Sequence, residues 1–246
     1  MLRLKAGVIA ALGLLLALSV AAPASAAGPM GKVRVFHDSP DAPAVDILVK
    51  GGPFATDTKV LSNVPYGTIS SYLTVPRATY HVKVNVAGTS TTAIETDLTV
   101  GKRPLTVAAI GSLGGDGGAF GLKVLNDRTG IRGNWALLRI AHTSPDAPAV
   151  DVQLRLFGRL WVPIVRDVSF GESTPYLRLP AKNPWTGRPI KYDLRIVAAG
   201  TNTVVENLLH TTLVKGRAQT VWAVGFLSPA GGNTNAFGVK ATLDGR

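Results

Sequence analysis

Two short segments of the chain place a histidine close to several carboxylates. The first runs His37-Asp38-Ser39-Pro40-Asp41-Ala42-Pro43-Ala44-Val45-Asp46 and returns 105 positions later as His142-Thr143-Ser144-Pro145-Asp146-Ala147-Pro148-Ala149-Val150-Asp151. Nine of the ten residues are identical in the two copies. Imidazole nitrogens and carboxylate oxygens bind zinc in proteins, and carboxylate oxygens also bind calcium. The first chemistry to consider is therefore a metal site in each copy.

Zinc needs three or four ligands of constrained geometry, and calcium needs six to eight oxygens. The candidate ligands are His37, Asp41 and Asp46 in the first copy, and His142, Asp146 and Asp151 in the second. Two or three carboxylates are few for either ion. The competing interpretation is that these groups hydrogen-bond the backbone of a proline-rich corner that cannot satisfy itself. We predict this structural role, with no bound metal or other cofactor.

A hydrolytic site would need a nucleophile, a general base and an orienting acid. Ser39 and His37 are close in sequence, but Ser39 precedes Pro40 and suits the turn better. The nucleophile motif G-x-S-x-G does not occur, and the chain has no cysteine. We predict that the protein is not an enzyme. The alternative left open is a calcium- or zinc-dependent adhesion or hydrolytic module that uses the two corners.

Alternating apolar residues on both sides of each segment predict that it joins two strands. Val33, Val35 and His37 share a face before the first copy, and the alternation resumes at Val45 after it. Proline presets the backbone of the turn and extends the residue before it. We define the corner motif by residues of both copies: His37, Ser39, Pro40, Asp41, Pro43 and Asp46, and His142, Ser144, Pro145, Asp146, Pro148 and Asp151.

The repeat continues well beyond the corner. The alternating residues from Tyr80 to Val86 correspond to those from Tyr192 to Ala198, and both sets precede a turn that contains glycine. Each copy contains about seven short segments rich in Val, Thr, Ile and Tyr. This pattern predicts two tandem antiparallel β-sandwich domains of the immunoglobulin-like kind. We place the first at residues 27–128, a polar linker at 129–137 and the second at 138–246.

The first 26 residues have the pattern of a secretory signal peptide. Arg3 and Lys5 precede an apolar run, and Ala24-Ser25-Ala26 matches a cleavage site, so we expect an exported chain that begins at Ala27. No later apolar run is long enough for a membrane span. Without residues 1–26 the chain has 24 basic and 15 acidic residues, which favours polyanionic surroundings. There is no basic run or aromatic platform of the kind that binds nucleic acid.

The second copy carries eight extra residues between Pro180 and Tyr192. Trp185 and Arg188 lie in this insertion, which we predict to be either a binding loop or a hairpin that packs on the sandwich edge. Long surface loops often carry binding functions. The partner would be a cell-wall polyanion, a carbohydrate or a surface protein.

Taken together, these segments resemble a known bacterial module. The strand ending in histidine, the Ser-Pro-Asp-Ala-Pro-Ala-Val-Asp corner, the Tyr-Gly…Tyr-Leu-x-Val-Pro segment and the Thr-Val-Ala-Ala-Ile-Gly strand are similar to the bacterial domain of unknown function 4397. The resemblance covers residues 33–127 once and 138–244 once. It implies a secreted or cell-envelope-associated β-sandwich module, with a binding or structural role and no established activity.

Overall fold

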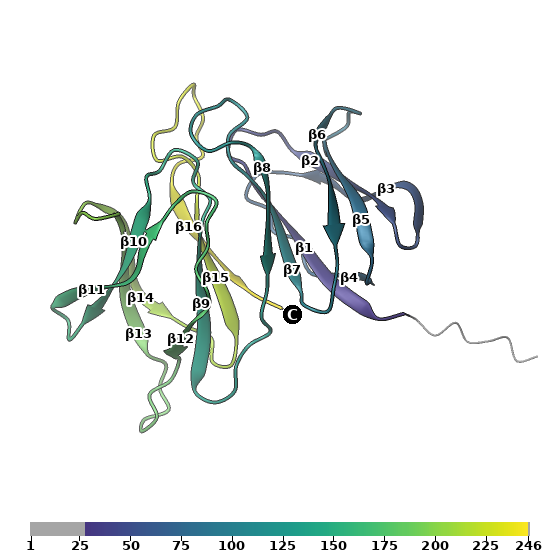
Figure 1. The fold of residues 1–246 in the computed structure, drawn as a ribbon. Coiled ribbons are helices and arrows are strands. Elements are labelled where there is room, and N and C mark those ends of the chain that lie inside the picture. Colours follow the sequence, from purple (N-terminus) through teal and green to yellow (C-terminus); the bar gives the residue numbers. More distant parts are fainter. Residues whose placement is uncertain (1–27, 246) are drawn as a thin grey trace, which may run out of the picture.

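The computed structural model describes residues 28–245. The predicted signal peptide, residues 1–26, lies outside the described residues. The described chain folds entirely into β-strands and the turns between them (Figure 1). Within residues 28–245 no helix is long and apolar enough to cross a membrane.

The first repeat is a sandwich of two four-stranded sheets. One sheet has the order β4-β1-β7-β8 and the other the order β3-β2-β5-β6. Its core contains the alternating side chains of β2 and β5, among them Val45, Ile47 and Val84. The strands are β1 (Met30–Asp38), β2 (Val45–Gly51), β3 (Phe54–Val64), β4 (Leu73–Pro76), β5 (Thr79–Val86), β6 (Thr92–Thr99), β7 (Leu105–Ile110) and β8 (Gly121–Asn126).

The second repeat has the same strand order. Its sheets are β12-β9-β15-β16 and β11-β10-β13-β14, around a core that includes Leu138, Val150 and Ile196. The strands are β9 (Trp135–His142), β10 (Val150–Leu156), β11 (Leu160–Val168), β12 (Leu177–Pro180), β13 (Lys191–Ala198), β14 (Val204–Thr212), β15 (Ala218–Val224) and β16 (Gly238–Leu243). The prediction of two tandem β-sandwiches is confirmed.

Two details of each sandwich differ from the prediction. Each repeat has eight strands rather than about seven, because β3 and its counterpart β11 are edge strands whose alternation is weak. Each repeat also contains one parallel pair, β1 with β7 and β9 with β15, within an otherwise antiparallel arrangement. In addition, β9 begins at Trp135, so the predicted linker 129–137 overlaps the first three residues of this strand.

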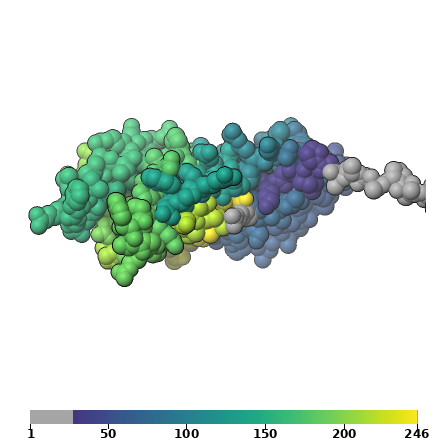
Figure 2. Space-filling view, turned by 90° about the horizontal axis from the view of Figure 1, so that it is seen from below, coloured from purple at the N-terminus to yellow at the C-terminus, as the bar shows by residue number. Residues whose placement is uncertain are grey.

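The two sandwiches meet through one sheet each. We call β4-β1-β7-β8 and β12-β9-β15-β16 the inner sheets, and the other two the outer sheets. The inner sheets lie in the middle of the molecule in Figure 1, and Figure 2 shows the two repeats as adjoining lobes. Phe36 of β1 and Trp222 of β15 are fully buried between them, with ring centroids 5.1 Å apart in an edge-on arrangement. The second half of β1 and nearly all of β9 are buried on both faces.

Candidate functional site

His37 stands at the end of β1 and is fully buried. Its Nε2 donates a hydrogen bond to the carbonyl of Pro43 at 2.9 Å, and its Nδ1 faces the backbone N–H of Ser39 at 3.5 Å. Burial lowers the pKa of His37, and the bond to Pro43 only partly opposes this. The imidazole is therefore neutral at physiological pH, with its proton on the nitrogen that holds the corner closed.

The second corner repeats the bond to the proline carbonyl, but His142 Nδ1 has no hydrogen-bond partner among the described residues. His142 is also fully buried, and its Nε2 donates to the carbonyl of Pro148 at 2.9 Å. Burial again lowers the pKa, against the opposing effect of the Pro148 bond. In both copies the histidine thus ties a strand end to a carbonyl six residues ahead, across the proline turn.

The aspartate that follows the first proline of each corner, Asp41 or Asp146, binds a loop of its own repeat. Asp41 accepts hydrogen bonds from the backbone N–H groups of Leu113 at 3.0 Å and Gly114 at 2.7 Å, and from the Ser112 hydroxyl at 2.7 Å. Partial burial raises the pKa of Asp41, but these bonds outweigh it, and the pKa is lowered overall. Asp146 accepts in the same way from the N–H groups of residues 227 and 228, at 2.6 and 2.7 Å.

The last aspartate of each corner stabilises a distorted point of the neighbouring strand. Asp46 accepts from the N–H of Asn63 at 2.8 Å, and Asp151 accepts from the N–H of Asp167 at 2.8 Å. Asn63 and Asp167 have φ of 50° and 54°, a left-handed backbone that asparagine and aspartate tolerate better than most residues. Both lie where the register of the edge strand shifts.

Asp46 has one partner that its counterpart does not share. The Lys59 ammonium lies 2.6 Å from its carboxylate, and Gly88 donates a further backbone bond at 3.2 Å. The bond from Lys59, followed by those from Asn63 and Gly88, lowers the pKa of Asp46 to about 2. Asp151 keeps only the equivalent backbone bonds, the second of them from Gly200 at 3.3 Å.

The corner residues therefore do not converge on one point. Each carboxylate faces a different set of backbone donors, and the Ser39 hydroxyl donates to the carbonyl of Gly111 at 2.6 Å. Among residues 28–245 no group of three or more His, Asp or Glu side chains is arranged to hold a metal ion. What the geometry does is close a turn and fix the loops around it.

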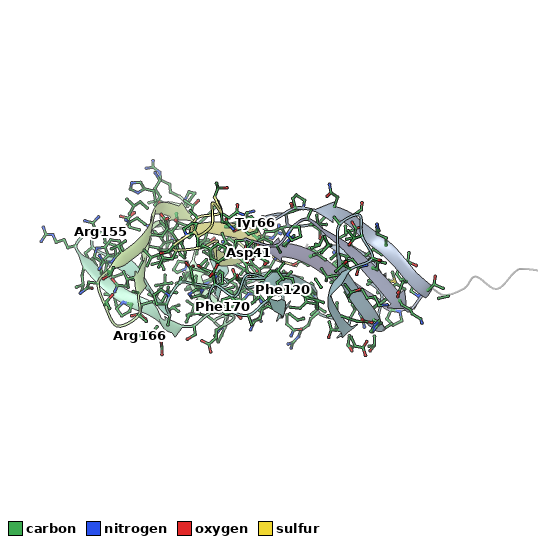
Figure 3. All side chains as sticks on the ribbon, turned by 90° about the horizontal axis from the view of Figure 1, so that it is seen from above. Asp41, Tyr66, Phe120, Arg155, Arg166 and Phe170 are labelled. Atoms are coloured by element: carbon green, nitrogen blue, oxygen red, sulfur yellow. The ribbon has the colours of Figure 1, made fainter. Side chains whose placement is uncertain are left out.

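The corners also join the two repeats. The carbonyl of Pro40 accepts from the side-chain amides of Asn233 and Asn235, at 3.0 and 2.6 Å, and the carbonyl of Pro145 accepts from the N–H of Gly118 at 2.7 Å. A Cβ on the adjacent Gly117, whose φ is +97°, would lie 2.1 Å from that Pro145 carbonyl. The glycine-rich loop after β7 is thus shaped to receive the opposite corner (Asp41 and Tyr66 mark this region in Figure 3).

The one motif position that differs between the copies lies at this junction. Asp38 is fully buried, and neither carboxylate oxygen has a hydrogen-bond partner among the described residues. Its counterpart Thr143 lies nearby in the other repeat and donates its hydroxyl to the carbonyl of Ala223 at 2.9 Å. Burial raises the pKa of Asp38 well above its usual value, against the smaller opposing effects of Thr143 and the Lys240 ammonium.

A second buried polar cluster crosses the interface, and the sequence analysis missed it. Arg34 of β1 pairs with Asp244 at 2.5 Å, and Arg139 of β9 pairs with Asp127 at 2.5 Å. All four side chains are at most 4% exposed. Each arginine thus finds its carboxylate in the other repeat. We call these four residues the crossed ion pairs.

Neighbouring hydroxyls complete the hydrogen bonding of the crossed ion pairs. Asp127 accepts from Tyr72 and Thr106 of its own repeat, at 2.6 and 2.5 Å, and Asp244 accepts from Tyr176 and Thr220 at 2.7 and 2.6 Å. The guanidinium carbons of Arg34 and Arg139 lie 4.8 and 4.6 Å from the ring centres of Tyr72 and Tyr176. Arginine recurring on the polar face of the same strand in both copies was the available signal.

The predicted binding loop projects from the second repeat between β12 and β13. Trp185 is 90% exposed and Arg188 is exposed, so the loop does not cover the sandwich edge. It is nevertheless ordered by Asn183, whose side-chain oxygen accepts from the N–H groups of Trp185 and Thr186 at 2.9 and 3.0 Å. The Tyr192 hydroxyl still bonds the carbonyl of Pro180, as Tyr80 bonds Pro76 in the first repeat, so the insertion leaves its base unchanged.

Comparisons with known proteins identify a family. The family model described as Domain of unknown function (DUF4397) matches residues 31–153, half of the chain. No curated protein matches the chain. Among solved structures, the Bacillus anthracis TIE protein is similar at a TM-score of 0.26 and 13% identity, over 80% of this chain and 34% of that one.

Proposed function

The chain belongs to the DUF4397 family, and on that premise we propose that it is a secreted, non-enzymatic binding module of the bacterial cell surface. The second repeat is then a second copy of the family's domain. The identical strand order of the two sandwiches and the repeated corner support this assignment. The tripartite N-terminus supports export, and mass spectrometry of secreted material should give Ala27 as the first residue.

The chemistry of the corners supports a role without catalysis. The nucleophile candidate Ser39 donates to a carbonyl, and His37 donates to another, so neither is arranged to activate the other. In the described part of the chain the carboxylates of the corner motif bind backbone donors or a lysine. These groups maintain the rigid junction of the two repeats.

The observation that carries the binding proposal is the exposure of Trp185. Burying a tryptophan side chain stabilises a protein. Trp185 is nevertheless 90% exposed, on an ordered loop that the first repeat lacks. Tryptophan and arginine are the residue types that most often dominate binding interfaces. Arg188 on the same loop and the excess of basic residues suit an anionic polymer of the cell wall.

The test is binding of the mature chain to purified cell-wall fractions. The double change Trp185→Ala and Arg188→Ala should weaken binding about tenfold or more, as expected for the loss of an interface anchor. A control that changes Leu113 and Arg103, on exposed loops of the first repeat, to alanine should bind as the unchanged protein does. Equal loss in both variants, or no binding by the unchanged chain, would refute the proposal.

A further inference from the structure

The hairpin between β10 and β11 ends in an unusual turn. The N–H of Arg159 donates to the carbonyl of Leu156 at 3.0 Å, which closes a turn whose central residues are Phe157 and Gly158. Both central residues have positive φ, 51° for Phe157 and 68° for Gly158. Turns of this kind favour asparagine or glycine, and a bulky side chain in the left-handed region is a rare outlier.

The first repeat shows what the fold itself requires at this place. Gly52 stands 105 positions before Phe157 and has nearly the same φ, 55°. A Cβ on Gly52 would lie 2.8 Å from the Tyr80 hydroxyl, so that turn packs inward and excludes a side chain. The nearby aromatic Phe54 is half-buried there against Tyr80, at 6.3 Å between ring centres. The first repeat thus uses glycine where the second has an aromatic residue.

Phe157 contributes little to packing in the second repeat. It is 93% exposed, and Leu160 on the same tip is 60% exposed. An exposed side chain gains almost nothing from the hydrophobic effect, and the turn would be more favourable with asparagine or glycine. Backbone strain that stability does not explain is a sign of function when it coincides with an accessible side chain.

Arginine residues surround this apolar tip. Arg155 and Arg159 flank the turn; Arg155 lies 3.9 Å from Asp193, and within residues 28–245 Arg159 forms no ion pair. The guanidinium groups of Arg155 and Arg195 lie over the Trp161 ring, 5.7 and 4.5 Å from its centre. Figure 3 places Arg155 at the end of the molecule remote from the first repeat, where the rest of the protein does not hinder an approach.

We propose that the β10–β11 tip docks on a membrane surface that contains anionic phospholipid. The side chains of Phe157 and Leu160 enter the boundary between headgroups and acyl chains, and Arg155 and Arg159 pair with headgroup phosphates. The exposed apolar pair favours a bilayer over a wall polymer, because only the bilayer offers an apolar phase. This inference rests on the proposed function for placing the protein outside the cell, but not on the Trp185 loop.

The experiment is co-sedimentation of the mature chain with vesicles of phosphatidylcholine, with or without phosphatidylglycerol. The unchanged protein should bind the mixed vesicles and bind pure phosphatidylcholine at least about fivefold more weakly, the effect of one basic residue near an anionic surface. Phe157→Asn should reduce binding to mixed vesicles roughly tenfold, because the apolar anchor is lost. This variant stays folded, since asparagine suits the left-handed turn, and its melting temperature should equal or exceed that of the unchanged chain.

Two further variants separate this inference from the wall-binding proposal. Arg159→Glu should weaken binding to mixed vesicles and leave binding to phosphatidylcholine unchanged. Trp185→Ala should reduce binding to wall fractions while vesicle binding persists. Equal binding by Phe157→Asn and the unchanged chain would overturn membrane insertion, because charge attraction alone would then explain the binding. Failure of the unchanged chain to bind mixed vesicles would also overturn it, whatever the wall fractions show.

Discussion

The outer sheets of the two repeats have the same strand order but different surface chemistry. On the first, His81 lies 2.7 Å from Glu95 and 2.8 Å from Asp97, and Lys83 lies 2.8 Å from Asp57. Exposed ion pairs of this kind contribute little stability, but they neutralise the surface. On the second, Arg155 and His210 lie 3.9 and 3.3 Å from Asp193. Two arginines also stack on Trp161, and apolar side chains are exposed at the β10–β11 tip.

The inner sheets show the reverse, because their polar contacts are matched almost residue for residue. Arg34 and Arg139 make equivalent bonds, including one each to a backbone carbonyl of the opposite repeat, at 2.8 and 2.9 Å. The crossed ion pairs are thus equivalent in the two repeats, whereas the buried Phe36–Trp222 contact has alanine at the corresponding positions, Ala141 and Ala108. Both proposed binding surfaces, the Trp185 loop and the β10–β11 tip, lie on the second repeat.

The largest expected effect tests the equivalence of the inner sheets. Arg34→Met leaves the buried Asp244 carboxylate with only its longer contact to Arg139, at 3.8 Å, which should cost about 3–5 kcal/mol of unfolding free energy. Arg139→Met should cost a similar amount, because Asp127 is equally buried. Guanidinium denaturation measures both. A loss below about 1 kcal/mol in either variant, the range of exposed ion pairs, would show that the crossed ion pairs do not hold the interface.

A somewhat smaller effect is expected where the two corners differ. Asp38→Thr makes the corners identical and removes a buried carboxyl without hydrogen-bond partners, so it should stabilise the fold by roughly 1–3 kcal/mol at pH 7.5.

The pH dependence of that gain follows from the sign of the shift. Because burial raises the pKa of Asp38 above 3.8, ionisation disfavours the folded state once the pH exceeds that value. The gain from Asp38→Thr should therefore shrink as the pH falls toward 3.8. Thermal melting at several pH values measures it, and a destabilising Asp38→Thr at pH 7.5 would contradict this explanation.

Asp46 and Asp151, the last aspartates of the two corners, should differ in how much they stabilise their repeats, because only Asp46 binds a lysine. Asp46→Ala and Asp151→Ala should both lower the melting temperature, mainly of their own repeats, with the larger decrease for Asp46→Ala. The pKa of Asp46 is lowered to about 2, so its stabilisation is complete above 3.8 and is lost as the pH falls through 2. Differential scanning calorimetry from pH 2 to 7 tests this. Equal decreases at every pH would show that Lys59 makes no difference.

The smallest expected effect is that of a chelator. EDTA should leave the melting temperature unchanged, because the corner carboxylates already bind backbone N–H groups. Asp46→Ala and Asp151→Ala serve as controls in the same scan. A decrease of many degrees with EDTA, absent from these variants, would instead establish a metal site at the corner.

For β1, the sequence predicted which residues face the core of the sandwich, but not that the opposite face is buried against the other repeat. The alternation of Val33, Val35 and His37 indicated the core face of β1, as the structure confirms. The opposite face, with Arg34 and Phe36, has the pattern of a solvated strand with an occasional apolar residue. Only the position of the second repeat buries it, and alternation within one strand carries no information about that position.

The sequence also could not predict which strands pair with each other or whether a loop is exposed. The periodicity of β1 is the same whether its partner is parallel or antiparallel, so the pairing with β7 could not be predicted. The Trp185 loop was recognised by comparing the two copies, but whether it packs or projects depends on contacts far away in the chain. The tip at Phe157 was overlooked, because a single aromatic residue in a turn gives no signal without its backbone conformation.

The crossed ion pairs have a consequence for how the two repeats would behave apart. Residue for residue, each repeat offers an arginine to its neighbour and receives one in return, which is the reciprocity of an isologous two-fold dimer. A repeat separated from its neighbour would expose a guanidinium and a carboxylate that have lost their partners. Two such fragments would satisfy both groups by associating with each other. The tandem chain therefore holds, within one polypeptide, the reciprocal contacts of a two-fold dimer.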